Sequence, residues 1–471
     1  MHSDQLNRNL AFGFTFLAIL FYYFVFKTYH GTGDDGDSIS HYLYARWSWE
    51  MKYIWLNHWG KPIFTFLSSP FAQFGFKGIQ FFNTSLGILT GYLTHLVARK
   101  LEFKHSAFVI PLILLMPEYM KTSYSGLTEI LFAFLLILSI YLFLNEKYVV
   151  SYTIVSFLPF CRPDGNAVIA MIGLLSLLHP VYRRYIYYLL TGHIALSIIG
   201  VIFFDENWLW LFTKNPNAYH EFDYANGGWL SYIKGLLSFM SLPIYILFWL
   251  GMVCTGHQFS KSKSKHKLIF IIYFIGLSIF TMHTILYKFS LFRGIGLLRY
   301  LVPIAPILGL LCLNGFEFLI DRLSKLKVRP LIACSLIILI TTVYVFSPSK
   351  YSAHFPSLFD LNNTQKLSIE VLKYINEKIP NNNLKYYSYP YFSVLEEVNP
   401  NNWEQHRYLN SERANEDIPK GSILIWDDWY CVQDYDVTPS KLAKIPNLKL
   451  IRKFETFDND KIRSFIVYLK E

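Results

Sequence analysis

The sequence predicts an all-α polytopic membrane protein with about eleven transmembrane helices, followed by a small C-terminal α/β domain outside the membrane. Of the 471 residues, 53% are hydrophobic and only 16% are charged, and the mean hydropathy is +0.29. A soluble domain of this length would carry more charge. The composition changes near residue 347, where charged, Asn-rich and Pro-containing stretches begin. We therefore predict a transmembrane domain over 1–346 and a soluble domain over 347–471.

The apolar runs approach the ~20 residues that a helix needs to cross a bilayer. They are 10–26, 78–98, 106–117, 126–144, 148–160, 166–179, 185–204, 236–255, 268–287, 300–320 and 330–346. The first run ends in the bulky residues 27–30 and not in a small-residue cleavage site, so it is predicted to be a retained anchor. Runs 106–117, 148–160 and 166–179 are short, which predicts tilted, broken or partly re-entrant helices.

Basic residues orient these helices, because cytoplasmic loops are enriched in Lys and Arg. They gather in alternate loops, at Arg99, Lys100, Lys104, Lys147, Arg183, Arg184, Lys261, Lys263, Lys265, Lys267, Arg322, Lys325, Lys327 and Arg329. The N-terminus is then cytoplasmic. The segments 28–77, 118–125, 161–165, 205–235, 288–299 and everything after about 347 are extracytoplasmic. The net charge of +10 is thus a topology signal and not evidence for nucleic-acid binding.

The C-terminal part combines two periodicities. Apolar residues recur at helical spacing in 364–378, and short apolar runs typical of strands follow at 422–426, 449–451 and 464–469. The five cysteines form no CxxC pair and no Cys/His cluster, so the sequence supports neither a disulfide framework nor a zinc site. The lack of disulfides and the compact loops favour a bacterial inner membrane protein.

Three carboxylates stand within four residues directly after the first apolar run, at Asp34, Asp35 and Asp37. Like charges this close repel one another, so a cation partner or a raised pKa is expected if the side chains converge. One interpretation is a general base, with a metal or ammonium anchor beside it. The other is a solvated acidic turn in which Asp37 or Ser38 caps a helix over 39–50.

Further polar residues stand in the outward loops. His58 and Lys61 flank a turn that either anchors the chain in the interface or contacts substrate. Glu129 begins an apolar helix, where a carboxylate gains from the helix dipole. Acidic residues at membrane depth cost about 2.5–3.5 kcal/mol, so Glu129 is equally a functional candidate.

Three arginines stand in the later outward turns between predicted helices, and two of them, Arg293 and Arg299, go against the charge rule. Arg162 stands beside Asp164 in a tight Pro-containing turn, and its planar guanidinium suits a phosphate. Arg293 and Arg299 precede the run 300–320. They could extend to the lipid headgroups, but together with Arg162 they would build a cationic pocket that captures an anion.

In order and sidedness these motifs resemble the GT-C superfamily of polytopic glycosyltransferases, which includes protein O-mannosyltransferases and bacterial aminoarabinose transferases. The resemblance covers roughly residues 1–346. The motifs are Asp34-Asp35-Gly36-Asp37 with His41-Tyr42, Ser125-Gly126-Leu127-Thr128-Glu129, Arg162-Pro163-Asp164-Gly165 and Arg299-Tyr300-Leu301-Val302-Pro303. No WWDxG-type sequence is present, which argues against an oligosaccharyltransferase catalytic subunit.

The resemblance implies a polyprenyl- or dolichyl-phosphate-linked sugar donor and transfer on the outer face, with inversion at the anomeric carbon. The loop-one catalytic aspartate of the family maps onto Asp37, with Asp35 as the runner-up, and Arg162, Arg293 and Arg299 would hold the donor phosphate. The expected substrate contacts are Asp34, His41, Tyr42, His58, Lys61, Glu129, Asp164 and Tyr300. Members differ in metal dependence, so a divalent metal ion is left open.

The acceptor is equally open, as an extracytoplasmic glycan, lipid or protein. Two other functions compete with the enzyme. A transporter or flippase of lipid-linked sugars would show half-repeats and midplane charges, which we do not find in this sequence. A non-enzymatic assembly or receptor protein would depend on its exported tail for binding a partner.

Overall fold

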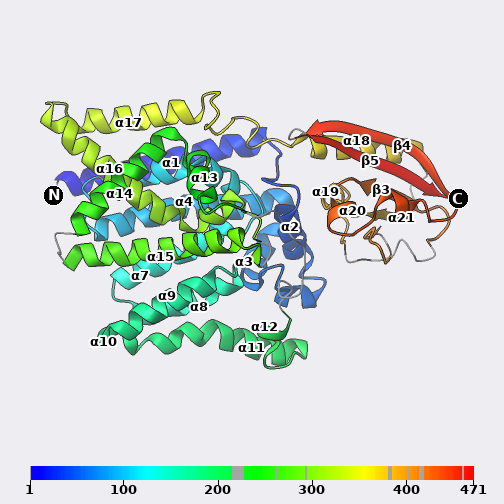
Figure 1. Ribbon diagram of the computed structural model, residues 1–471, viewed down its shortest axis with the longest axis horizontal. Helices are drawn as coiled ribbons and strands as arrows, with labels where there is room; N and C mark the ends of the chain where they lie inside the picture. Colours follow the sequence, from blue (N-terminus) through cyan, green and yellow to red (C-terminus); the bar gives the residue numbers. More distant parts are fainter. Residues whose placement is uncertain are drawn as a thin grey trace.

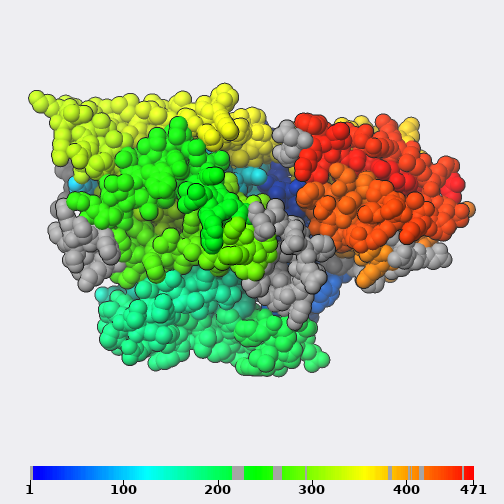
Figure 2. Space-filling view, in the orientation of Figure 1, coloured from blue at the N-terminus to red at the C-terminus, as the bar shows by residue number. Residues whose placement is uncertain are grey.

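The computed structural model describes residues 2–214, 227–259, 264–291, 294–379, 384–400, 402, 404, 406–412, 418–458 and 461–471. Figure 1 shows the helices side by side in one block, with the C-terminal sheet at the end of the block opposite the N-terminus. In the space-filling view the sheet region forms a lobe of its own beside the helices (Figure 2).

Helices make up the part of the chain before residue 346. They are α1 (His2–Thr28), α2 (Asp37–Trp47), η1 (Lys52–Leu56), α3 (Pro62–Ala72), α4 (Phe76–Lys100), η2 (Ser106–Phe108), α5 (Val109–Leu114), α6 (Pro117–Ser123), α7 (Glu129–Leu144), α8 (Tyr148–Phe157), η3 (Leu158–Phe160), α9 (Gly165–Leu178), α10 (Pro180–Arg183), η4 (Ile186–Leu190), α11 (Thr191–Phe204), α12 (Trp210–Thr213), α13 (Ser231–Met240), α14 (Leu242–Phe259), α15 (Ser264–Lys288), η7 (Leu298–Ile304), α16 (Ala305–Lys325) and α17 (Pro330–Val345).

Each predicted apolar run lies on these helices, and the short run 106–117 is broken as expected, between the end of α5 at Leu114 and the start of α6 at Pro117. The run 236–255 is not continuous, because Ser241 adopts a positive φ of 70° and separates α13 from α14. Among the described residues, four segments are long and apolar enough to cross a membrane: Asp4–Thr28, Ile186–Phe204, Leu268–Lys288 and Leu298–Lys325. Shorter apolar helices accompany them, so the chain is a multi-pass, all-helical membrane protein with a small C-terminal sheet domain, as predicted.

Two of the predicted basic clusters, the one after α4 and the one at the end of α16, lie together, and Lys261 and Lys263 lie outside the described residues. Lys104, just after α4, lies 3.3 Å from the carboxylate of Asp321 near the end of α16. The Asn7 amide in α1 donates a hydrogen bond to the Lys104 carbonyl at 2.8 Å. The segment η7, which carries Arg299, precedes the opposite end of α16. The motif of Arg299 therefore lies away from these two basic clusters, and the side that faces the cytoplasm stays a prediction.

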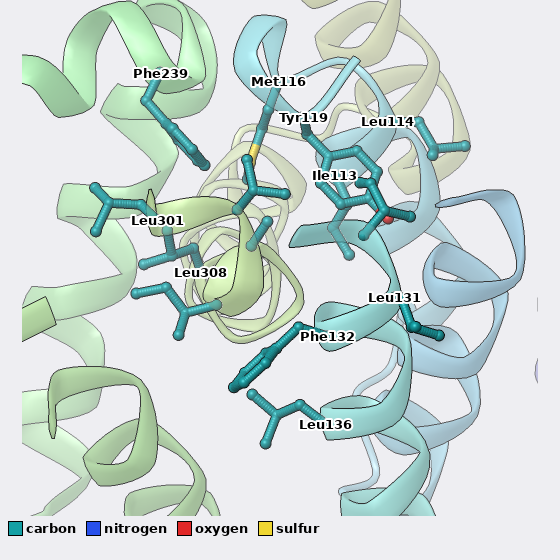
Figure 3. Close-up of a cluster of buried hydrophobic side chains, with 14 of the residues drawn as sticks. Ile113, Leu114, Met116, Tyr119, Leu131, Phe132, Leu136, Phe239, Leu301 and Leu308 are labelled. Carbon is teal, nitrogen blue, oxygen red and sulfur yellow. The ribbon is translucent and has the colours of Figure 1, made fainter. Parts of the chain in front are cut away.

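The interior is filled by side chains from several helices. Figure 3 shows Phe132 and Leu136 of α7, Phe239 of α13, and Leu301 and Leu308 of η7 and α16 within one buried cluster. Helices α14 and α16 come so close that backbone lies against backbone. A Cβ atom at Gly315 would lie 2.0 Å from the Leu247 carbonyl oxygen, and one at Gly251 would lie 1.9 Å from that of Leu311.

Gly315→Ala is therefore expected to lower the melting temperature in detergent. The added methyl would meet backbone that cannot give way, and overpacking of this kind costs about 1–3 kcal/mol. Gly256→Ala is the matched control, because this glycine lies in α14 and an added Cβ there has nothing within 4 Å. If the two variants melted at the same temperature, the close contact of α14 and α16 would not be a feature of the folded protein.

The C-terminal region is a five-stranded mixed sheet in the order β2-β1-β3-β5-β4, with helices packed on it. Its elements are α18 (Asn363–Lys378), β1 (Lys385–Tyr387), α19 (Tyr391–Leu395), β2 (His406–Arg407), β3 (Ile423–Asp427), α20 (Tyr430–Gln433), α21 (Pro439–Leu442), β4 (Leu448–Asp458) and β5 (Lys461–Lys470). β1 pairs in parallel with β2 and β3, whereas β5 runs antiparallel to both of its neighbours. The predicted helix and strand runs are confirmed, and the boundary at 346/347 stays a prediction.

Candidate functional site

The loop between α1 and α2 is held by Asp34. Its Oδ1 accepts hydrogen bonds from the backbone N–H groups of Gly36, at 3.0 Å, and Ser38, at 2.9 Å. The prediction that Asp37 or Ser38 caps this helix is wrong, because the N-cap residue of α2 is Gly36. The hydroxyl of Ser38 donates to the Thr32 carbonyl, and the carboxylate of Asp37 pairs with Arg299. Asp34 thus satisfies the exposed donors at the start of α2 and shapes the loop.

Arg299 joins this loop to the last third of the transmembrane region. Its Nη1 pairs with Asp34 and its Nη2 with Asp37, so one planar guanidinium holds both carboxylates. Its Nε lies 3.6 Å from Oε1 of Glu129. The positive guanidinium in contact with both carboxylates offsets the repulsion between Asp34 and Asp37.

Glu129 links the two arginines that contact these acids. The same Oε1 that faces Arg299 lies 2.7 Å from Nη1 of Arg162, and Nε of Arg162 lies 2.8 Å from Asp164. The Tyr300 ring lies beside both guanidinium groups, 5.3 Å from that of Arg162 and 5.9 Å from that of Arg299. We call Asp34, Asp37, Glu129, Arg162, Asp164 and Arg299 the carboxylate–arginine cluster.

The sequence reasoning missed His283 in α15. Its ring stacks on Tyr300 with centroids 5.2 Å apart, and its Nε2 lies 3.4 Å from Asp164. The available signal was a lone ionisable residue inside an apolar run, which is a functional candidate by default in a membrane protein. His283 extends the polar site toward the centre of the helical block.

Exposure separates the members of the cluster. The side chain of Glu129 is 1% exposed and that of Asp164 is 8% exposed. Asp37 is 43% exposed, against 25% for Asp34. Asp37 is thus the carboxylate of the cluster that an incoming molecule reaches most readily.

Lys61 is a cation of a different kind, at the start of α3. Its Nζ donates to the His58 carbonyl at 3.2 Å, and among the described residues no carboxylate lies within ion-pair distance of it. Burial, reinforced by the nearby charge of Arg162, lowers the pKa of the Lys61 amine to about 8. The amine is therefore mostly charged at neutral pH and free to meet an anion.

The other predicted contacts lie outside the cluster. The rings of His41, Tyr42 and His58 pack against neighbouring aromatic rings. Burial, with the positive charge of Lys61, holds the pKa of His41 well below its usual range, so its ring is neutral at pH 7. Arg293 lies outside the residues that the structure describes.

Asp35 faces away from the cluster and toward the sheet domain. The Asn362 amide and the Tyr389 hydroxyl both lie 3.4 Å from its Oδ2. Burial, together with the charge of Asp34, raises the pKa of Asp35. A cavity of about 190 Å³ opens here between the loop and the sheet domain. Its acidic lining residues are Asp35, Asp427, Asp428 and Asp458.

In the described part of the chain, no group of three or more His, Cys, Asp or Glu side chains is arranged to hold a metal ion. Two of the three loop acids that the sequence left open for a divalent ion, Asp34 and Asp37, contact the guanidinium of Arg299 in this structure.

An apolar groove of about 720 Å³ lies between helices α9 and α13–α16. Its wall includes Phe280, one turn before His283 on α15, and Ile304, just after Tyr300. The ring of Tyr232 is 6.1 Å from that of Phe280 and 6.2 Å from that of His283. The lining of the groove therefore comes within about one helical turn of His283 and Tyr300, but none of the cluster residues lines it.

No protein family profile matches this chain, and no curated protein matches it. Two solved structures of ArnT from Cupriavidus metallidurans are similar. The apo form superimposes with a TM-score of 0.60 at 11% identity, covering 97% of this chain and 98% of ArnT. The form bound to undecaprenyl phosphate gives 0.59 at 11% identity, covering 96% and 97%. The chain therefore shares the fold of the ArnT structures over nearly its whole length.

Proposed function

We propose that this protein is an integral membrane glycosyltransferase. It moves a sugar from a polyprenyl-phosphate donor to an extracytoplasmic hydroxyl, with inversion. One observation carries the proposal. Asp37, near the start of the chain, and Arg299, far along it, form an ion pair in a partly exposed polar site. An apolar groove whose lining comes within about one helical turn of His283 and Tyr300 is consistent with it.

Asp37 is the general base of this proposal. Asp34 is occupied, because one oxygen accepts two backbone N–H groups and the other pairs with Arg299. Asp35 lies against the sheet domain. Asp37 holds only Arg299 among the described contacts and keeps one carboxylate oxygen available. It removes the proton of the acceptor hydroxyl, whose oxygen bonds to the sugar C1 as the bond from C1 to the phosphate oxygen breaks.

Lys61 receives the phosphate that leaves. The guanidinium groups of Arg162 and Arg299 already face carboxylates, so they add positive potential while Lys61 supplies the uncompensated charge. Neutralising a leaving phosphate is the largest electrostatic task of this reaction. The polyprenyl chain occupies the apolar groove. The ArnT structure bound to undecaprenyl phosphate supports a donor of this class.

The site lies at the end of the helical block opposite the basic clusters after α4 and at the end of α16. By the positive-inside rule we infer that the N-terminus is cytoplasmic and that the site and the sheet domain are extracytoplasmic. A bacterial inner membrane is the location that we propose.

A panel of polyprenyl-phosphate sugars tests the proposed function. Purified protein is incubated with each donor and a mixture of hydroxyl acceptors, and donor loss and released polyprenyl phosphate are followed together. We expect one donor to be consumed with equal release of polyprenyl phosphate. Movement of intact donor across vesicle membranes, with no bond broken, would identify a flippase and overturn the proposal.

Lys61 gives this site a predictable pH dependence. The pKa of the amine lies at about 8, above neutrality, so its charge is present at pH 7 and lost as the pH rises through 8. The KM for the donor should therefore increase above pH 8. Lys61→Met should raise this KM at least about tenfold at pH 7, since a hydrogen bond to a charged group contributes about 1.5–3 kcal/mol.

Two variants serve as controls for this prediction. Lys61→Arg keeps its charge and should remove the increase in KM above pH 8. Lys52→Met changes an exposed lysine of η1 and should leave KM unaltered. A donor KM in Lys61→Met equal to that of the wild type would exclude Lys61 from phosphate binding.

A further inference from the structure

The sheet domain reaches the loop of Asp34 and Asp37 through Gln365, in the first turn of α18. Two bonds tie Gln365 to Asn362, since its N–H donates to Asn362 Oδ1 at 2.7 Å and its Oε1 accepts from the Asn362 N–H at 3.2 Å. Because a backbone N–H only donates, the second bond fixes which end of the Gln365 amide is oxygen. The amide nitrogen Nε2 then points at the Thr32 hydroxyl, 2.6 Å away.

The direction of this bond determines what Thr32 does next. The Gln365 amide nitrogen can only donate, so the Thr32 hydroxyl accepts from it and gives its own hydrogen to the carbonyl of Asp34. The Thr32 carbonyl accepts from the Ser38 hydroxyl at 2.5 Å. In turn, Ser38 accepts from the N–H of Gly126 at 2.7 Å, three residues before Glu129.

These groups are buried, which makes the bonds costly to lose. Thr32 is 3% exposed, Gln365 is 2% exposed and Ser38 is 0% exposed. A buried polar group without a partner costs about 1–3 kcal/mol. Two further contacts join the loop to the C-terminal part of the chain. The Gly31 N–H donates to the Phe359 carbonyl at 2.9 Å. The Tyr430 hydroxyl lies so close to Gly36 that an added Cβ would be 2.6 Å from it.

We propose that Gln365 is a positioning residue for the catalytic loop, so that the sheet domain is a working part of the transfer site. The bonds from Gln365 through Thr32 set the backbone of Asp34, whose side chain shapes the start of α2 where Asp37 stands. This inference rests on the proposed function, because it assigns the sheet domain to the same reaction. A displacement of about 1 Å at a reacting group can reduce a rate by about 10²-fold.

Substitutions on both sides of the bond test the proposal. Gln365→Met and Thr32→Val each remove the contact at nearly constant size, and Thr32→Ser keeps the hydroxyl. We expect the first two to lower kcat at least about tenfold with the donor KM within about twofold, and Thr32→Ser to retain most of the activity. The double variant Gln365→Met/Thr32→Val should be no slower than Thr32→Val alone, since both changes break one path.

Thr364→Val is the matched control. Thr364 lies in the same turn of α18, but its hydroxyl donates to Asp458 in β4 at 2.7 Å and not to the loop. This variant should lower the melting temperature without lowering kcat. Unchanged kcat in Gln365→Met, or a decrease no larger than that in Thr364→Val, would overturn the positioning role.

Hydrogen exchange gives a readout that needs no turnover. The N–H groups of Gly36 and Ser38 bond to Asp34, so they should exchange faster in Gln365→Met than in the wild type or in Thr364→Val. Equal exchange would overturn the structural step. Faster exchange in a protein that consumes no donor would instead overturn the proposed function and leave the loop contact intact.

Discussion

Asp37→Asn is expected to reduce sugar transfer by about 10²–10⁴-fold, the range that a placed general base contributes. Asparagine has the size of aspartate but cannot take the acceptor proton. Arg299 would keep Asp34 and Glu129 as partners, so the cluster should remain assembled. Expression and membrane insertion should be those of the wild type. The measurement is the initial rate of donor consumption at equal amounts of purified protein.

Asp321→Asn is the control for this experiment. Asp321 is 57% exposed and pairs with Lys104 at the other end of the helical block, so the variant loses a carboxylate of no catalytic importance. It should transfer at the wild-type rate. Undiminished transfer by Asp37→Asn would remove Asp37 from the mechanism.

Arg299→Met should produce the largest loss of stability of any single change in the site. The guanidinium contacts Asp34, Asp37 and Glu129, and its side chain is 9% exposed. Removing it leaves these carboxylates beside one another, and breaking a buried ion pair costs about 3–5 kcal/mol. We expect a large decrease in melting temperature in detergent and no measurable transfer.

Arg299→Lys distinguishes charge from geometry. A lysine restores one positive charge but cannot bond two carboxylates in a plane, so the variant should regain part of the stability and little of the activity. Arg322→Met changes an exposed arginine near the end of α16 and should change neither the melting temperature nor the transfer rate. A melting temperature for Arg299→Met equal to that of the wild type would show that the carboxylates do not depend on this arginine.

The members of the site could be named from the sequence because charged groups are rare and costly in an apolar chain. Glu129, Arg162 and Arg299 stand out in this way. Their pairing could not be predicted, since Arg299 and Asp37 are separated by 262 residues and only the packing of the helices brings them together. His283 was missed because one histidine in an apolar helix carries no pattern.

The loop acids show a second limit of sequence reasoning. The sequence does not distinguish the three aspartates Asp34, Asp35 and Asp37 from one another. The direction in which each side chain points depends on the turn that forms when the N–H groups of Gly36 and Ser38 bond to Asp34. Asp35 is turned toward Asn362, a residue of the sheet domain that no local pattern connects to the loop. Strands β1 and β2 escaped prediction because three and two residues are too short to show alternation.

A structure of the protein with bound undecaprenyl phosphate tests the central claim most directly, namely that the carboxylate–arginine cluster is the transfer site. The phosphate should lie within hydrogen-bond distance of Lys61 and beside Arg162 and Arg299, with the polyprenyl chain in the groove along α15. Density for the phosphate at the opposite end of the helical block, near Lys104, with the groove empty, would contradict it.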